Sequence, residues 1–120
     1  MAKILVVDDS VSIRNMVSFT LKQQQHEVVE ASDGMDGLAK AKAGRFELVI
    51  TDVNMPRMDG IALCQALRQL PAFKFTPILM LTTESSNEIK MKGKGAGATG
   101  WLVKPFNPEK LLATIKRVIR

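Results

Sequence analysis

The sequence predicts an α/β protein with one doubly wound, five-stranded parallel sheet and five helices. Short apolar runs alternate along the chain with segments whose apolar residues recur at helical spacing. The runs are apolar almost throughout, as expected of strands that helices cover on both faces. Reactive side chains directly follow four of the runs, at Asp8, Asp52, Thr82 and Lys104. These observations predict the fold class and a candidate site at one edge of the sheet.

The first predicted strand, residues 3–7, is followed by a helix. Ser10 is suited to cap that helix, because its hydroxyl can accept a hydrogen bond from a free amide of the first turn. The polar run 23–26 closes it. Four apolar residues recur at helical spacing and form the expected core-facing stripe. They are Ile13, Met16, Val17 and Leu21.

A second strand–helix pair and a third strand follow. The strand at 27–31 leads into a helix over 34–43, and Gly44 is placed to end that helix because glycine adopts helix-terminating conformations readily. The third strand, 47–51, consists of apolar residues apart from its two ends. It is expected to lie at the centre of the sheet.

The third helix and the fourth strand are predicted from a cap and an apolar run. Asp59 is the expected N-cap of a helix whose apolar positions extend to Leu70. The fourth strand is residues 77–81, and a helix over 86–92 follows it. The glycines at 93, 95 and 97 crowd the end of this helix, where each interior glycine costs about 1 kcal/mol relative to alanine. We therefore expect this end to fray.

The last strand and helix, residues 100–103 and 108–119, complete five alternating pairs. Such alternation implies parallel strands joined by right-handed crossovers. Five strands joined in this way most often adopt the order 2-1-3-4-5, the flavodoxin-like arrangement. That order sets the first and third strands side by side, so Asp8 and Asp9 share one crevice with Asp52.

Composition fits one domain spanning residues 1–120. Hydrophobic residues make up 46% and charged residues 24%, ordinary values for a chain long enough to bury a core. No apolar run approaches the roughly 18 residues of a membrane span, and no export signal is evident. The one cysteine, Cys64, cannot form an intramolecular disulfide and falls within a helical pattern. We expect a cytoplasmic monomer without a membrane partner.

The net charge of +5 comes partly from two basic stretches. One is Lys90, Lys92 and Lys94, and the other is Lys110, Lys116, Arg117 and Arg120. The chain has few aromatic residues and no tyrosine, which argues against nucleic-acid binding. Solvated helix faces are the favoured interpretation, and an acidic protein partner is the alternative. Residues 95–100 read GAGATG, but they precede a strand instead of following one, so they do not indicate a dinucleotide site.

The acidic residues at the predicted sheet edge indicate a cation site. Asp8, Asp9 and Asp52 cannot lie together uncompensated, because like charges would raise the pKa of at least one of them. Mg²⁺ favours such hard oxygen ligands, and Mn²⁺ can substitute for it. No histidine or cysteine accompanies the acids, which argues against zinc or iron. Each acid alone could be a helix cap or turn residue; their convergence, with Lys104 opposite, favours the cation.

A carboxylate beside a bound cation can act as a nucleophile toward phosphorus and form an aspartyl phosphate. Such a transfer depends on positioning and charge neutralisation, which the cation and Lys104 would supply. The Thr82 hydroxyl is placed to donate a hydrogen bond to a phosphoryl oxygen. Asp52 is the favoured nucleophile because its strand is central. Strand-end geometry alone leaves Asp9 as the alternative.

Four segments of the chain carry these residues. They are DDS at 8–10, DVNMPRMDG at 52–60, LTTE at 81–84 and GATGWLVKPF at 97–106. Together they resemble the receiver domain of two-component response regulators, and the resemblance covers the whole chain. Within that family the sequence is most similar to the stand-alone chemotaxis regulators of the CheY type.

The resemblance implies a set of ligands. Asp52 would accept a phosphoryl group from the phosphohistidine of a chemotaxis-type histidine kinase. Asp9, Asp52 and the backbone carbonyl of Asn54 would bind Mg²⁺ directly, and Asp8 would help through water. Lys104 would pair with the phosphoryl group. A cis peptide bond before Pro105 is common in the family.

The resemblance also implies switch and tuning residues. Thr82 would move to bond the phosphoryl group, and Trp101 stands where the family has a switch aromatic, usually Tyr or Phe. Thr83 replaces a usually smaller residue beside Thr82 and would restrict access of water or a phosphatase. Asn54 and Glu84 match positions that tune hydrolysis of the acyl phosphate.

The function expected is a signalling switch, not an enzyme beyond its own Mg-dependent phosphorylation and dephosphorylation. Phosphorylation would alter a face formed by the fourth helix, fifth strand and fifth helix, with a flagellar motor switch protein and a phosphatase as possible partners. A phosphate sink, a non-motor single-domain regulator and a receiver excised from a longer regulator are alternatives. An aspartate-nucleophile phosphatase would need a second acid where Asn54 stands. A transcription factor would need a further domain.

Overall fold

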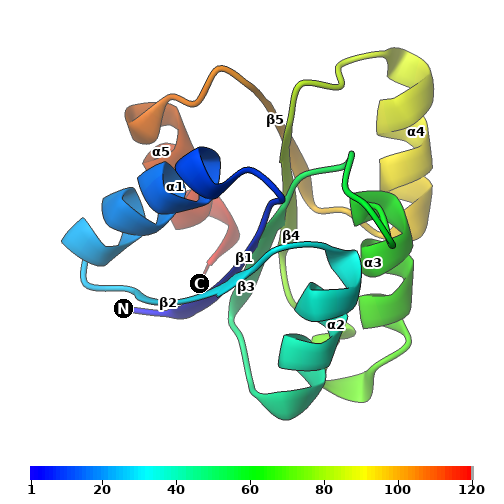
Figure 1. The fold of residues 1–120 in the computed structure, drawn as a ribbon, viewed down its shortest axis with the longest axis horizontal. Coiled ribbons are helices and arrows are strands. Elements are labelled where there is room, and N and C mark those ends of the chain that lie inside the picture. The colour runs from blue at the N-terminus through cyan, green and yellow to red at the C-terminus, as the bar shows by residue number, and fades with distance from the viewer. Residues whose placement is uncertain (120) are drawn as a thin grey trace.

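The computed structural model describes residues 1–119 and confirms the predicted sheet. Five parallel strands lie in the order β2-β1-β3-β4-β5 (Figure 1). The strands are β1 (Lys3–Val7), β2 (Glu27–Ala31), β3 (Leu48–Thr51), β4 (Ile78–Thr82) and β5 (Gly100–Val103). The helices are α1 (Val11–Gln23), α2 (Gly34–Ala43), α3 (Gly60–Arg68), α4 (Asn87–Ala96) and α5 (Pro108–Val118), with a 3₁₀ turn at Pro71–Phe73 that the sequence did not predict.

Helices cover both faces of the sheet, which is why the strands are mainly apolar. α1 and α5 lie on one face, and α2, α3 and α4 lie on the other (Figure 1). Successive residues of β1 point alternately into the two layers: Leu5 packs in the core beneath α2 and α3, and Ile4 packs in the core beneath α1 and α5. Both side chains are fully buried. Alternation along β1 therefore buries apolar side chains on both faces of the sheet.

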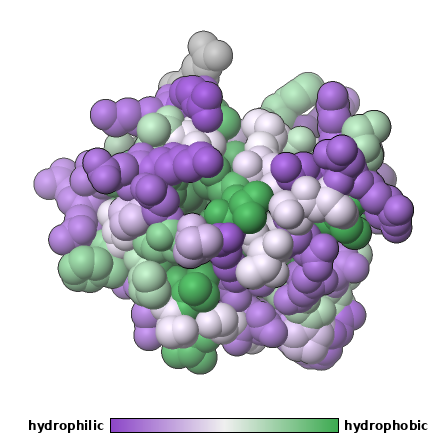
Figure 2. Space-filling model, turned by 90° about the horizontal axis from the view of Figure 1, so that it is seen from above, coloured by the Kyte–Doolittle hydropathy of each residue, from purple (hydrophilic) through white to green (hydrophobic). Residues whose placement is uncertain are grey.

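Side-chain caps begin the helices at the expected places. Ser10 accepts a hydrogen bond from the Ile13 amide, and Asp59 accepts one from the Ala62 amide at 2.7 Å. Both predicted caps are confirmed. Among the described residues no helix combines the length and apolarity needed to cross a membrane. The surface is largely hydrophilic: on the face seen in Figure 2, hydrophilic side chains surround smaller hydrophobic areas.

The fourth helix is longer than the sequence predicted. α4 runs to Ala96 instead of ending at Lys92, and Gly97, with φ 105°, terminates it in the left-handed conformation. The backbone amide of Gly97 bonds to the carbonyls of Gly93 and Lys94. A Cβ added at Gly93 would lie 2.5 Å from Cζ3 of Trp101, so the glycine leaves room for the indole. That packing compensates for the low helix propensity of glycine, and the expected fraying of this helix end stays a prediction.

The stripe predicted for α1 is wrong at one position. Val17 and Leu21 are buried as expected, but Met16 is 48% exposed. The buried face includes Ser18 and Thr20 instead. Because α1 packs with that side toward the sheet, a helical period alone did not fix which apolar positions point inward.

Candidate functional site

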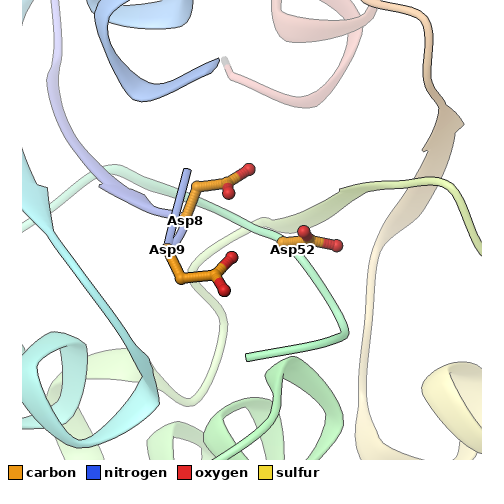
Figure 3. A group of neighbouring side chains, drawn as sticks. All are labelled: Asp8, Asp9 and Asp52. Atoms are coloured by element: carbon orange, nitrogen blue, oxygen red, sulfur yellow. The ribbon is translucent and has the colours of Figure 1, made fainter. Parts of the chain in front are cut away.

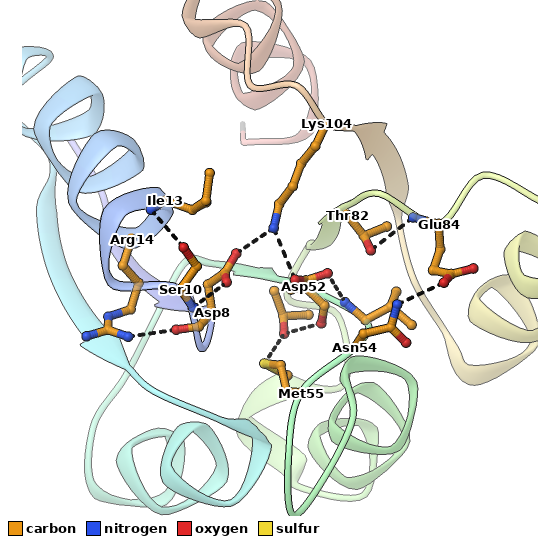
Figure 4. Close-up of polar contacts among 12 residues, drawn as sticks. Asp8, Ser10, Ile13, Arg14, Asp52, Asn54, Met55, Thr82, Glu84 and Lys104 are labelled. Atoms are coloured by element: carbon orange, nitrogen blue, oxygen red, sulfur yellow. Dashed lines mark hydrogen bonds and ion pairs between the residues drawn. The ribbon is translucent and has the colours of Figure 1, made fainter.

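The carboxyl edge of the sheet gathers the predicted site residues. Asp8 follows β1 and Asp52 follows β3, and these neighbouring strands pair Val7 with Thr51, so the two acids leave the sheet side by side. Lys104 follows β5 and reaches across the edge to both (Figure 4). The expectation that these strand ends converge is confirmed.

Three carboxylates form one cluster. One carboxylate oxygen from each of Asp8, Asp9 and Asp52 lies within 4.8 Å of the others (Figure 3). Asp8 and Asp52 are buried, and Asp9 is exposed. All the donors are hard oxygens, and no histidine or cysteine belongs to this cluster. The donor set fits Mg²⁺ or Mn²⁺, and it does not fit a soft metal.

Lys104 is the counter-charge of the cluster. Its Nζ lies 3.0 Å from Oδ2 of Asp8 and 3.0 Å from Oδ2 of Asp52, and only 12% of its side chain is exposed. Burial acts to lower the pKa of this ammonium, but the two carboxylates outweigh it and the pKa is raised. Lys104 is therefore charged at physiological pH and holds both acids in one arrangement.

Backbone amides fix the remaining oxygens of the buried acids. Val53 N donates to Oδ1 of Asp52 at 2.7 Å, and Ser10 N donates to Oδ1 of Asp8 at 2.9 Å. Arg14 Nη1 donates to the backbone carbonyl of Asp8 at 2.8 Å. Sequence reasoning missed these supports, because a backbone donor carries no side-chain signal and Arg14 resembles any helical arginine. Each buried carboxylate is thus held from two sides.

Burial dominates the electrostatics of Asp8. Desolvation raises the pKa of this carboxyl above its ordinary value of 3.8, although the Ser10 amide and Lys104 act to lower it. The negative charge of Asp52 adds to the increase. The crowding of like charges expected from the sequence therefore contributes to the raised pKa of Asp8, but burial is its main cause. A bound divalent cation would relieve it.

The raised pKa of Asp8 predicts a pH dependence of stability. Without metal, the folded protein keeps a proton on Asp8 at pH values above 3.8, where the unfolded chain has released it. The contribution of this group to the free energy of unfolding is then present below the unfolded pKa and is lost as pH rises through the folded pKa. The free energy of unfolding of Asp8→Asn, measured with urea in EDTA, should therefore increase relative to that of the wild type from acidic to neutral pH. A constant difference between the two would contradict this assignment.

The predicted switch residues surround Glu84. Thr82 is fully buried at the end of β4, and its Oγ1 accepts a hydrogen bond from Glu84 N at 3.3 Å. Nε1 of Trp101 donates to the Glu84 carbonyl at 2.8 Å. Figure 4 shows the contact of Asn54 with the same residue, in which Nδ2 donates to Oε2 of Glu84 at 2.9 Å. Glu84 therefore links the loop after β3, the loop after β4 and strand β5.

Two other predicted residues stand apart from these contacts. Thr83, next to Thr82, is exposed. The Lys104–Pro105 peptide bond is cis, directly after the lysine that contacts Asp8 and Asp52. The geometry thus brings together Asp8, Asp9, Asp52 and Lys104, with Thr82 at the end of β4 and Asn54 in the loop after β3.

Comparisons with known proteins agree with this geometry. Residues 4–116 match the family model described as the response regulator receiver domain. The structure of the chemotaxis protein CheY4 of Vibrio cholerae is 60% identical, covers 99% of both chains and superposes with a TM-score of 0.96. The beryllofluoride-activated DrrB receiver domain is 37% identical, with a TM-score of 0.87 over 98% of this chain and 97% of that one.

Two curated relatives differ in how much of them the chain spans. Protein PilG of Pseudomonas aeruginosa is 39% identical over 95% of this chain and 84% of PilG. The alkaline phosphatase synthesis regulator PhoP of Bacillus subtilis is 39% identical over 98% of this chain, which spans only 48% of PhoP. The chain belongs to the response regulator receiver domain family of two-component systems.

Proposed function

We propose that the protein is a phosphorylation-dependent signalling switch whose phosphoacceptor is Asp52. The observation that carries the proposal is the pair of 3.0 Å contacts from Lys104 Nζ to Asp52 and Asp8, beside the third carboxylate of Asp9. A buried lysine shared between two acids is expected where charge must be neutralised at a reacting oxygen. The chain acts as one receiver domain, and its place of action is the cytoplasm.

The chemistry is transfer of a phosphoryl group from a phosphohistidine. A carboxylate oxygen of Asp52 forms a bond to phosphorus as the phosphorus–nitrogen bond breaks, and the electron pair returns to the imidazole. The ammonium of Lys104 offsets negative charge on the phosphoryl oxygens, and the Thr82 hydroxyl donates to one of them. These are positioning and electrostatic roles, so the chain promotes only its own phosphorylation and dephosphorylation.

A divalent cation, Mg²⁺ or Mn²⁺, supplies further neutralisation of the phosphoryl charge when it is bound. Asp9, Asp52 and the carbonyl of Asn54 would hold it directly, and Asp8 would help through water, as the family resemblance implies. The oxygen-only cluster within 4.8 Å and the raised pKa of Asp8 support the three acids of this set. Asp9 is exposed, which keeps one carboxylate accessible to a cation that arrives from solvent.

Hydrolysis of the acyl phosphate is tuned by Asn54 and Glu84. Their side chains are joined by a 2.9 Å hydrogen bond between the loops after β3 and β4, at the entrance to the acidic cluster. Exposed Thr83 restricts the approach of water or of a phosphatase on the same side. The lifetime of the phosphorylated state depends on these three side chains.

The output is a change of the surface formed by α4, β5 and α5. Trp101 on β5 bonds to Glu84, whose amide bonds to Thr82 at the end of β4, so movement of Thr82 is transmitted to the indole. A hollow of about 230 Å³ lies beside it, lined by two lysines and the indole. Lys90 and Lys94 make this hollow suitable for an acidic segment of a target protein.

The pathway proposed is chemotaxis, with a chemotaxis-type histidine kinase as donor and a flagellar motor switch protein as target. The 60% identity to CheY4 of Vibrio cholerae favours it. A role as phosphate sink or as a non-motor regulator uses the same site. A receiver within a longer regulator is favoured by the relation to PhoP, of which the chain spans about half.

Mass spectrometry of the protein treated with a phosphorylated kinase and Mg²⁺ tests the proposal. We expect one added phosphoryl group on Asp52 and none in Asp52→Asn, because the amide is not a nucleophile toward phosphorus. Asp59→Asn is the matched control: asparagine also caps helices, so α3 and phosphorylation should be retained. Phosphorylation of another residue in the wild type, or of Asp52→Asn to the wild-type extent, would refute the assignment.

A further inference from the structure

The loop that leaves Asp52 contains an uncommon turn. Arg57 has φ 66°, in the left-handed region that glycine and asparagine usually occupy. The Met58 amide bonds to the Pro56 carbonyl at 2.7 Å, which closes a three-residue γ-turn with Arg57 at its centre. A γ-turn with positive φ at its central residue is rare and strained. Such a conformation persists only where the surrounding contacts hold it.

The side chain of Arg57 supplies such a contact. Its Nε lies 2.8 Å from Oδ2 of Asp33, and its Nη2 lies 3.1 Å from Oδ1, so the ion pair is bidentate. The Asp33 side chain is 10% exposed, and Oδ1 also accepts from the Asp36 amide at 2.8 Å as the N-cap of α2. The partner of the arginine is therefore fixed to a helix and cannot follow the loop if the loop moves.

Backbone contacts hold the same turn against α2. Gly34 N donates to the Met58 carbonyl at 3.2 Å, and a Cβ at Gly34 would lie 2.2 Å from that oxygen. The start of α2 and the residue after Arg57 are thus in direct contact. The ion pair and this contact together connect α2 to the loop that carries Asn54.

We infer that Arg57 is a positioning residue of the metal site, acting through its bidentate ion pair with Asp33. The pair tethers the turn at residue 57 to the start of α2 and thereby fixes the short stretch back to Asn54, whose carbonyl is a proposed ligand. The inference rests on the proposed magnesium site. Groups that orient metal ligands typically change metal affinity by about 10- to 100-fold when they are replaced.

Replacement of Arg57 should change the Mg²⁺ affinity in opposite directions through its charge and through its positioning contact. Loss of the positive charge of Arg57 would strengthen cation binding at a nearby acidic cluster. Loss of the positioning contact would weaken it. The sign of the change in Mg²⁺ affinity therefore separates the two.

The variant to measure is Arg57→Gly, by calorimetric titration with MgCl₂ of the full chain. Glycine adopts positive φ without strain, so this variant removes the ion pair while it tolerates the turn. We expect about tenfold weaker Mg²⁺ binding with a circular dichroism spectrum like that of the wild type. Arg45→Gly is the matched control, since Arg45 is exposed at the opposite edge of the sheet, and its affinity should be unchanged.

Asp33→Asn and the double variant complete the test. Asparagine retains the cap of α2 but loses the charge that holds Arg57, so this variant should also bind Mg²⁺ more weakly. The Mg²⁺ affinity of the double variant Asp33→Asn/Arg57→Gly should be no lower than that of the single variant with the lower affinity. The reason is that the same ion pair is lost in all three variants. The positioning role would be overturned if Arg57→Gly bound Mg²⁺ as tightly as the wild type or tighter, or if the losses of affinity were additive in the double variant. Either result would leave the proposed function standing. A wild type that does not bind Mg²⁺ would overturn the proposed function as well.

Discussion

Lys104→Met is expected to lower the free energy of unfolding of the magnesium-free protein by about 3 kcal/mol. The change leaves Asp8 and Asp52 without the ammonium that lies 3.0 Å from each, in a site where all three side chains are at most 12% exposed. Breaking a buried ion pair from one side costs more than the pair itself contributed, because an uncompensated charge remains. Urea unfolding in EDTA measures the loss.

Mg²⁺ should restore much of that stability, since a divalent cation binds the folded carboxylates and not the unfolded chain. Lys92→Met is the matched control. Lys92 pairs with Glu88 at 3.9 Å with both side chains more than half exposed, so its removal should change the stability by less than about 0.5 kcal/mol. Equal effects of the two substitutions would show that Lys104 does not carry the charge balance of the pocket.

The same variant tests switching. Lys104→Met should bind Mg²⁺ yet give a much smaller change of Trp101 fluorescence on addition of beryllofluoride, because the partner of the phosphoryl oxygens is missing. A wild-type fluorescence response would contradict the role proposed for the lysine.

Gly93→Ala should be less stable than Gly95→Ala by about 2 kcal/mol, although both replace glycine by alanine within α4. At Gly93 the added Cβ would lie 2.5 Å from Cζ3 of Trp101, so the ring or the helix must move. At Gly95 no atom lies within 4 Å, and the better helix propensity of alanine should raise stability by about 0.5–1 kcal/mol. Urea unfolding of the two variants gives the comparison directly.

Displacement of the indole should also break its hydrogen bond to the Glu84 carbonyl and change the fluorescence of Trp101. A smaller ring should relieve the clash, so Trp101→Phe should cost less stability in the Gly93→Ala background than in the wild type. If the two substitutions are additive, Gly93 and Trp101 are not coupled as their contact indicates.

The sheet and the pocket could be predicted because both follow from strand order. Once five strands alternate with helices, the residues after β1, β3 and β5 must meet at one edge, and Asp8, Asp52 and Lys104 do so. The sequence could not distinguish the burial of adjacent acids: Asp8 is buried and Asp9 is exposed. That difference depends on how the chain turns away from the strand.

Features that depend on distant contacts were not predictable. The low helix propensity of glycine favours an earlier end of α4, and the fit of Trp101 against Gly93 accounts for the greater length. The partnership of Arg57 with Asp33 joins residues 24 apart and has no periodic signal. The central place of Glu84 arises because its carbonyl, amide and carboxylate each meet a different element. Tertiary geometry decides all three.

The two bonds of Lys104 span 96 and 52 residues of chain, and this separation has a consequence for biogenesis. The ribosome releases Asp8, Asp9 and Asp52 well before the ammonium that balances them, so a nascent chain that pairs its first and third strands early experiences mutual repulsion without relief. Closing such long loops is entropically slow, which prolongs that interval. At the magnesium site proposed above, a bound cation would relieve this repulsion while the chain is still being made.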